Sequence, residues 1–171
     1  MHEDYFFIFS EGFAVVHNNY CEYGFINNSG EIVIPLIYEA ASGFSEGLAC
    51  VKKDGKYGYI DKTGKDIVRF IYNNARVFCE GLACVGDDCQ WGFINHAGEE
   101  VVPLIYDAVC DFKNGYAGVE KNGDRWVIDT NGKQVMSLVA EEYDHDSPES
   151  YFLSKRLKRL RKDAVEGFTI V

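Results

Sequence analysis

Cysteine and histidine are the side chains in this sequence with the most versatile chemistry, and their spacing determines what they could do. Six cysteines and four histidines supply thiol and imidazole groups, which act as nucleophiles or bind zinc in many proteins. Three groups lie closest together in the sequence: His17-x-x-x-Cys21, Cys84-x4-Cys89 and Asp144-His145-Asp146. None of them has the paired spacing of a structural zinc site, and no strand–turn–helix elbow surrounds a cysteine. We therefore expect no metal, no cofactor and no enzymatic activity.

Charge is the second feature with chemical consequences, because it is distributed unevenly along the chain. The formal net charge is -10, yet residues 155–162 (KRLKRLRK) carry six positive charges, so all other residues sum to -16. An acidic body repels phosphates, which argues against nucleic acid as its partner. The basic segment contains our predicted partner-binding residues, which are Lys155, Lys158, Arg159 and Lys162.

A sequence unit of about 34 residues is repeated along the chain. The fold of this unit must position the cysteine, histidine and charged side chains. Each copy opens with Phe-x-x-Gly, at Phe9, Phe44, Phe78 and Phe112. An aromatic-Gly pair follows, at Tyr23-Gly24, Tyr57-Gly58 and Trp91-Gly92, whereas the fourth copy reads Arg125-Trp126. An Asx-x-x-Gly element then begins at Asn27, Asp61, Asn95 and Asp129. A fixed period in this range indicates a repeat architecture.

The second copy shows how one unit is expected to fold. A strand over residues 48–53 meets the two-residue turn Asp54-Gly55, and a return strand covers residues 56–61. A third strand over residues 66–68 follows the Asx turn, and in other copies a proline such as Pro35 makes this strand an edge or ends it. The remaining residues form a crossover loop. We therefore predict an all-β fold, a repeat array of about four three-stranded antiparallel units.

A single unit of this size cannot bury its apolar face, so neighbouring units must stack to form a core. The opening Phe, the aromatic residue before glycine and the alternating Ile residues form the predicted buried column. The glycine after the aromatic residue suits the close approach of a neighbouring strand. Cys50 and Cys84 occupy the same place in consecutive copies, where Val15 and Gly118 stand elsewhere, which is typical of small buried side chains. We expect free, mostly buried thiols.

The pattern fades after Lys133, and a different segment completes the chain. We assign residues 1–140 to the repeat array, and residues 141–171 to an acidic linker, a basic amphipathic α-helix and a tail. Ser147-Pro148-Glu149 has the chemistry of a helix start. The apolar stripe of this helix recurs with helical spacing at Leu153, Leu157, Leu160 and Ala164. The helix is predicted to cap the open end of the array; a competing hypothesis has it bind acidic lipid or nucleic acid.

The repeated landmarks resemble the WG-repeat family, which is widespread in bacterial proteins and is named for its aromatic-Gly pair. The second and third copies match the family pattern best, and the match covers residues 9–111 clearly and continues to Lys133 with losses. Tyrosine replaces tryptophan in two copies, Arg69 stands where the family has a proline, and the glycine is missing at Trp126. These departures predict a less regular fourth unit. The resemblance implies a β-rich scaffold and supplies no catalytic residues.

The sequence predicts a non-enzymatic interaction scaffold whose extended acidic β-repeat surface binds a basic protein partner. The alternative is a carbohydrate- or cell-wall-binding module, in which the repeated aromatic rings stack on sugars. No apolar run approaches the roughly 20 residues of a membrane span. The start MHEDYFFIF is acidic, whereas a secretory signal begins with a basic region, so we expect a cytoplasmic protein. The oligomeric state is left open.

Overall fold

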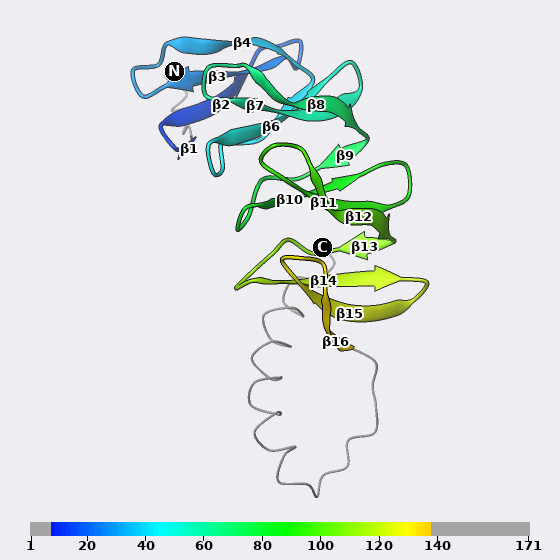
Figure 1. Ribbon diagram of the computed structural model, residues 1–171. Helices are drawn as coiled ribbons and strands as arrows, with labels where there is room; N and C mark the ends of the chain where they lie inside the picture. Colours follow the sequence, from blue (N-terminus) through cyan, green and yellow to red (C-terminus); the bar gives the residue numbers. More distant parts are fainter. Residues whose placement is uncertain (1–7, 138–171) are drawn as a thin grey trace, which may run out of the picture.

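The computed structural model describes residues 8–137, and Figure 1 shows them as a succession of small β-sheets. Sixteen strands form four antiparallel sheets of four strands each, and the described residues contain no helix. Strands that are consecutive in the chain are also neighbours within each sheet, so every sheet is a meander. This arrangement confirms the predicted all-β repeat fold.

Each sheet begins with a short strand and continues with three longer ones. The first sheet contains β1 (Phe9–Ser10), β2 (Phe13–His17), β3 (Tyr23–Asn27) and β4 (Ile32–Tyr38). The second contains β5 (Ala40–Ala41), β6 (Leu48–Lys53), β7 (Lys56–Asp61) and β8 (Asp66–Tyr72). The third contains β9 (Asn74–Ala75), β10 (Leu82–Gly86), β11 (Trp91–Asn95) and β12 (Glu100–Tyr106). The fourth contains β13 (Ala108–Val109), β14 (Tyr116–Lys121), β15 (Asp124–Asp129) and β16 (Gln134–Ser137).

The units have four strands, so the prediction of three-stranded units is wrong. The additional strand forms because two residues of the expected crossover loop pair with the first long strand of the next unit. Ala40 pairs with Lys52 and Ala41 pairs with Val51, and β9 and β13 repeat this arrangement. A two-residue strand is too short to produce an alternating pattern of apolar and polar residues, so periodicity cannot reveal it.

The outer strands β4, β8 and β12 each span seven residues. The prediction of an edge strand is correct, but the strand does not end at the proline and continues to the tyrosine. Between the pairs Tyr23–Tyr38 and Phe25–Ile34 the register shifts, so the outer strand bulges around Pro35. A residue inside a bulge is released from the hydrogen-bond ladder, and this suits proline, which lacks an N–H group.

The glycine after each aromatic residue is required by this bulge. A Cβ atom added at Gly92 would lie 2.4 Å from the carbonyl oxygen of Val102, and one added at Gly24 would lie 2.6 Å from that of Ile34. Both distances are shorter than any van der Waals contact between carbon and oxygen. The predicted close approach is therefore confirmed, and the approaching group is the backbone of the outer strand.

The fourth unit differs where this glycine is missing. Trp126 pairs with Val119, as Gly92 pairs with Val85, so Trp126 occupies the glycine position. Trp126 pairs with Ser137 directly beside the pair Val127–Met136, so the first of the two register shifts found in each of the other three sheets is absent here. The second shift, between Val127 and Ile128, is retained. A large side chain leaves no room for the bulging backbone of an outer strand. The predicted irregularity of the fourth unit is confirmed.

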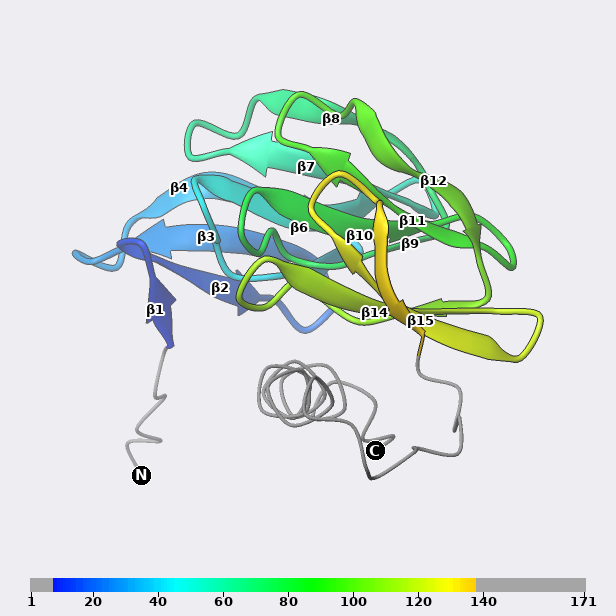
Figure 2. The same ribbon diagram turned by 60° about the horizontal axis from the view of Figure 1, so that its bottom comes forward.

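The hydrophobic core lies between consecutive sheets, which Figure 2 shows stacked on one another. At each junction the aromatic residue after the glycine meets the opening Phe of the next unit. The ring centroids are 4.9 Å apart for Phe25–Phe44, 4.9 Å for Tyr59–Phe78 and 4.8 Å for Phe93–Phe112. All six rings are buried, and their tilted or edge-on geometry is favourable for aromatic pairs. The aromatic residue before the glycine is only half-buried.

Part of the predicted domain division lies outside the described residues. This applies to residues 138–140 of the array and to the whole segment 141–171, with its linker, helix and tail. It also applies to the four predicted partner-binding residues, Lys155, Lys158, Arg159 and Lys162.

Candidate functional site

The Phe-x-x-Gly motif folds into a tight turn before the first long strand of each unit. Glu46 has a φ angle of 53° and Gly47 one of 84°, and Ser45 pairs with Leu48 across them. Two successive positive φ angles are typical of a type I′ turn, which favours Gly, Asn or Asp over Glu. The same position is occupied by Glu11, Glu80 and, in the last unit, Asn114. Glutamate at an unfavourable backbone position indicates that its carboxylate makes a useful contact.

The carboxylates of these glutamates connect each unit to the next. The backbone N–H of Gly81 donates to Glu46 Oε2 over 3.0 Å, and Ser45 Oγ donates to the carbonyl oxygen of Phe78 over 2.8 Å. Equivalent bonds run from Gly47 to Glu11 and from Gly115 to Glu80. The sequence analysis missed this role of the motif. The available signal was the repetition of Glu in a turn that otherwise favours Asn.

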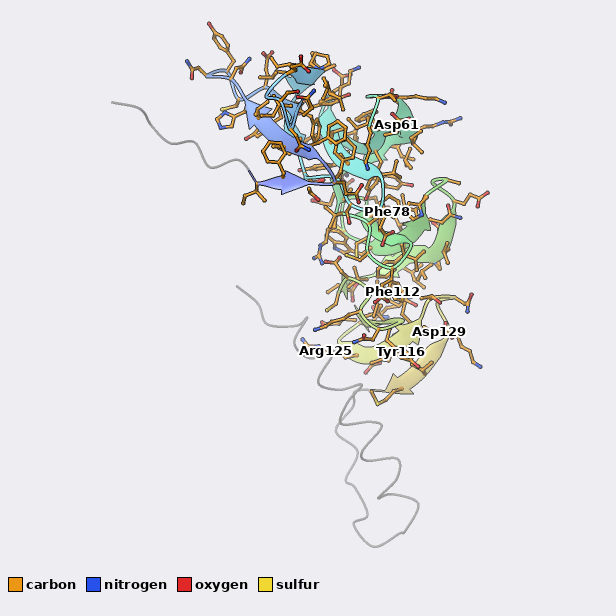
Figure 3. All side chains as sticks on the ribbon, turned by 90° about the vertical axis from the view of Figure 1, so that its left-hand side faces the viewer. Asp61, Phe78, Phe112, Tyr116, Arg125 and Asp129 are labelled. Carbon is orange, nitrogen blue, oxygen red and sulfur yellow. The ribbon has the colours of Figure 1, made fainter. Side chains whose placement is uncertain are left out.

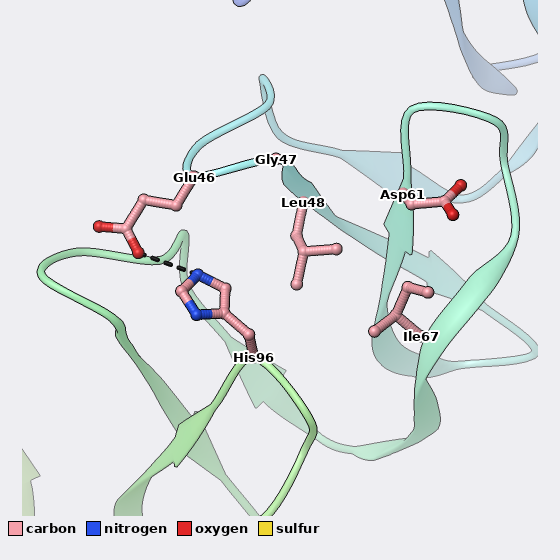
Figure 4. A pocket seen from close by; sticks show the side chains of 6 residues that line it. All are labelled: Glu46, Gly47, Leu48, Asp61, Ile67 and His96. Carbon is pink, nitrogen blue, oxygen red and sulfur yellow. Dashed lines mark ion pairs between the residues drawn. The ribbon is translucent and has the colours of Figure 1, made fainter.

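An open pocket of about 290 Å³ lies beside the junction of the second and third units (Figure 4). It is lined by Glu46, Gly47, Leu48, Asp61, Ile67 and His96. Nε2 of His96 lies 3.0 Å from Glu46 Oε2, and the imidazole ring stacks on Phe78 with a centroid distance of 4.4 Å. Nε2 makes no hydrogen bond to a described residue. The contact between His96 and Glu46 is therefore electrostatic, and it is an ion pair when the imidazole is protonated.

Comparison with the first junction indicates the purpose of this imidazole–carboxylate pair. There Lys62 Nζ lies 3.0 Å from Glu11 Oε2. Lys62 therefore occupies the position at the first junction that His96 occupies at the second. The ammonium group hydrogen-bonds to the carboxylate and lowers the pKa of Glu11. A side-chain nitrogen beside the turn glutamate is therefore a contact that the first two junctions share. No group of three or more His, Cys, Asp or Glu side chains within residues 8–137 is arranged to hold a metal ion.

The repeated aromatic residues, which the alternative hypothesis treats as sugar platforms, are largely covered. The rings after the glycine and the opening Phe of the second, third and fourth units are buried. Cations lie over the half-buried rings before the glycine: Lys52 Nζ is 5.4 Å from the Tyr57 centroid and Arg76 is 5.3 Å from the Trp91 ring. Phe78 and Phe112 lie within the stack in Figure 3. The interpretation as core is confirmed for the opening Phe of the second, third and fourth units. The aromatic residue before the glycine, which was also predicted to lie in the buried column, is only half-buried.

The six cysteines are free thiols, as the sequence predicts. Three of them are buried, namely Cys50, Cys84 and Cys110. Cys79 is half-buried, and the two exposed ones are Cys21 and Cys89. Burial raises the pKa of Cys50 to about 12 and also raises that of Cys84. Because the thiolate is the nucleophilic form of cysteine, these two buried thiols are packing groups.

The outer strands carry a surface that the sequence analysis missed. Four of its apolar side chains are well exposed: Ile32 (62%), Val33 (41%), Ile37 (52%) and Ile71 (58%). Exposed acidic residues accompany them, namely Glu31, Glu39, Asp66 and Glu100. The equal placement of Ile37 and Ile71, each directly before a tyrosine, was visible in the sequence. Alternation alone does not distinguish an exposed Ile at a sheet edge from a buried one. We call these eight residues the outer-strand surface.

A comparison with known protein families identifies the family of this chain. A family model described as the WG containing repeat matches residues 23–57, 57–88 and 91–124. The chain belongs to the WG-repeat family. The matches begin at Tyr23, the first residue of β3, and end at Asp124, the first residue of β15. They therefore leave out β1 and β2 and stop two residues before Trp126, which replaces the glycine. No curated protein matches the chain.

The family match indicates a repeated β module for protein interaction and identifies no partner. Within the part of the chain that the structure describes, no helix is long and apolar enough to cross a membrane.

Proposed function

We propose that this WG-repeat protein is a non-enzymatic scaffold that binds a basic protein partner through its extended acidic surface. The observation that carries the proposal is the charge of the array, since residues 8–137 contain 18 acidic and 11 basic side chains. Stacked units hold these charges at fixed positions over a long surface, which suits electrostatic recognition. A cytoplasmic location is part of the same proposal, because free thiols suit a reducing compartment.

Two sets of acidic side chains differ in their contacts. Glu46 and its equivalents hold the junctions between units. By contrast, Asp54, Asp66, Glu100 and Asp124 are exposed at a hairpin turn or at the first residue of a strand. Neutralising this second group removes four negative charges and leaves the turn glutamates in place.

The alternative function, carbohydrate or cell-wall binding, requires open aromatic platforms. Most of the repeated rings are buried in the junctions, and Tyr57 and Trp91 lie under a Lys or Arg side chain. In the first unit, Tyr23 is half-buried beside His17 and Phe9 is 43% exposed. Tyr20 is 86% exposed, but it belongs to the hairpin turn of the first unit alone. These observations favour protein binding over sugar stacking.

Affinity capture from a lysate of the source organism, with the full chain as bait, tests the proposal. We expect a basic protein to be retained at about 0.05 M salt and released at about 0.5 M salt, because salt screens exposed charges. The variant D54N/D66N/E100Q/D124N should retain much less of it. A control variant, K53Q/K121Q, removes positive charges instead and should retain at least as much.

Two results would contradict the proposal. One is the absence of any captured protein at both salt concentrations. The other is equal retention by the wild-type chain and the neutralised variant, because the acidic surface would then play no part. Retention of the chain by immobilised peptidoglycan, in place of a protein, would instead support the alternative function.

A further inference from the structure

We infer that the outer-strand surface is a docking site for a basic amphipathic α-helix of the partner protein. This inference rests on the proposed function and makes it specific, because it names the surface and the chemistry of the segment that binds there.

Apolar exposure within residues 8–137 is concentrated on the outer strands. Five of the eight exposed large hydrophobic side chains lie on β4, β8 and β16, and three of these five lie on β4. β4 and β8 belong to adjacent sheets, and Phe70 of β8 packs in the same core cluster as Ile34 and Tyr38 of β4. Exposed apolar groups gathered on one side of a protein mark an interaction surface more often than scattered ones do.

The charges beside these apolar residues have predominantly one sign. Glu31 precedes β4 and Glu39 follows it, while Asp66 opens β8 and Glu100 opens β12. Two exposed basic residues are exceptions: Arg69 in the middle of β8 and Lys65 directly before it. Apolar side chains bordered by carboxylates complement a segment that has an apolar stripe bordered by Lys or Arg.

The shape of the edge favours a helix over an added β-strand. Pro35 and Pro103 lie in the middle of β4 and β12, and the register of each strand is shifted there by the bulge. Proline and bulges protect a sheet edge against pairing with a further strand. A helix can instead cross the stack, touching one outer strand after another. Sheets packed about 10 Å apart correspond to about seven residues of a helix that rises 1.5 Å per residue.

A synthetic helix provides the probe for this inference. The peptide has about 21 residues, or three heptads, with leucine on one face and lysine on the other. A control peptide has the same composition in scrambled order. We expect the full chain to bind the amphipathic peptide and to bind the scrambled one much more weakly, as measured by fluorescence anisotropy at low salt.

Two variants of the chain locate the binding site. I37N/I71N removes apolar surface without changing charge and should weaken binding of the amphipathic peptide by about tenfold or more. D66K/E100K reverses two exposed charges and should weaken binding chiefly at low salt. The matched control Tyr20→Asn removes an exposed apolar side chain elsewhere and should change nothing. Thermal unfolding of each variant verifies that the array stays folded.

Equal binding of both peptides would overturn the inference, because charge alone would then explain the attraction. Undiminished binding by I37N/I71N would overturn it as well, since the site would lie elsewhere. If I37N/I71N fails to fold, the D66K/E100K variant provides the test instead. Undiminished binding of the amphipathic peptide by D66K/E100K at low salt would then overturn the inference. Each of these failures leaves the proposed function standing as long as the chain still captures a basic protein from the lysate in a salt-sensitive manner.

Discussion

At the scale of single residues, Gly92 and Glu11 show how a repeated residue follows from a repeated contact. Gly92 leaves room for the backbone of an outer strand, and the carboxylate of Glu11 accepts the N–H of Gly47 from the next unit. Gly92 acts within one unit and Glu11 joins two units, so each residue recurs because the unit is repeated.

Replacement of Gly92 by Ala should be strongly destabilising. The new Cβ would lie 2.4 Å from the carbonyl oxygen of Val102, so β12 would have to move away from β11. We expect a loss of about 2 kcal/mol or more in the free energy of unfolding, measured by urea denaturation. The matched control is Gly43→Ala, because its Cβ would lie 3.4 Å from the Ser10 side chain. Equal stability of the two variants would contradict the bulge as the reason for the glycine.

Replacement of Lys62 by Gln should raise the pKa of Glu11 toward its ordinary value of 4.5, because the hydrogen bond to Lys62 is the main cause of its lowering. In the wild-type chain the folded-state pKa lies below the unfolded one. The resulting stabilisation is therefore complete above pH 4.5 and is lost as the pH falls through the folded-state pKa. The Lys62→Gln variant should lose less stability over that acid range.

An NMR titration of the Glu11 carboxyl carbon measures this shift directly. The control Lys65→Gln changes a lysine of the same turn, which makes no contact with Glu11 among the described residues, and should leave the Glu11 pKa as it is. An unchanged Glu11 pKa in Lys62→Gln would mean that the ion pair does not persist in solution.

At the scale of the structural element, a unit is stable because its neighbours cover its rings. Phe44, Phe78 and Phe112 each insert an aromatic ring into the junction with the preceding unit, where it meets the ring of Phe25, Tyr59 or Phe93. The first copy has no preceding unit among the described residues, and there the equivalent Phe9 is 43% exposed.

Replacement of Phe78 by Ala should cost about 3–5 kcal/mol of unfolding free energy, because it leaves a cavity at a buried junction. Phe9→Ala alters the same position of the motif in the first unit and should cost well under half as much, since Phe9 is already partly in water. Thermal or urea denaturation of both variants provides the comparison. Similar losses would show that the motif phenylalanine acts within its own unit and not across the junction.

At the scale of the whole molecule, the array has two ends and a long edge. Stacked repeats need a cover on the terminal unit, because a last sheet without a neighbour exposes apolar surface. The predicted α-helix within residues 141–171 supplies the right chemistry for such a cover, with an apolar stripe that includes Leu157 and Leu160.

Deletion of residues 147–171 should lower the thermal midpoint of the array or cause it to aggregate, as measured by circular dichroism and light scattering. The double substitution Leu157→Gln/Leu160→Gln should have a similar effect, because it removes the apolar stripe alone. The matched control Lys155→Gln/Lys162→Gln alters only charge and should leave the midpoint unchanged. A truncated array that stays folded but no longer binds its partner would support the competing hypothesis that the basic residues form the binding site.

The sequence by itself placed the opening Phe in the core, although the ring that it meets is the one after the glycine and not, as predicted, the one before it. It also determined the period and the strands of each hairpin. These features rest on contacts between neighbouring residues: the Asp54-Gly55 turn needs positive φ angles, and the oxygen of Asp61 accepts N–H groups two and four residues later. The missing glycine at Trp126 also predicted the irregular fourth unit, because a large side chain at that position removes the first of the two register shifts.

Only the tertiary structure decided the fourth strand of each unit, the role of the turn glutamates and the outer-strand surface. Ala40 becomes a strand residue through Lys52, and Glu46 meets Gly81 from the next unit, so these contacts join residues that local patterns do not relate. Ile34 and Ile37 have the same side chain and lie three residues apart on one strand. Ile34 is 1% exposed and Ile37 is 52% exposed, because only the stacking of the sheets determines which of them faces the core.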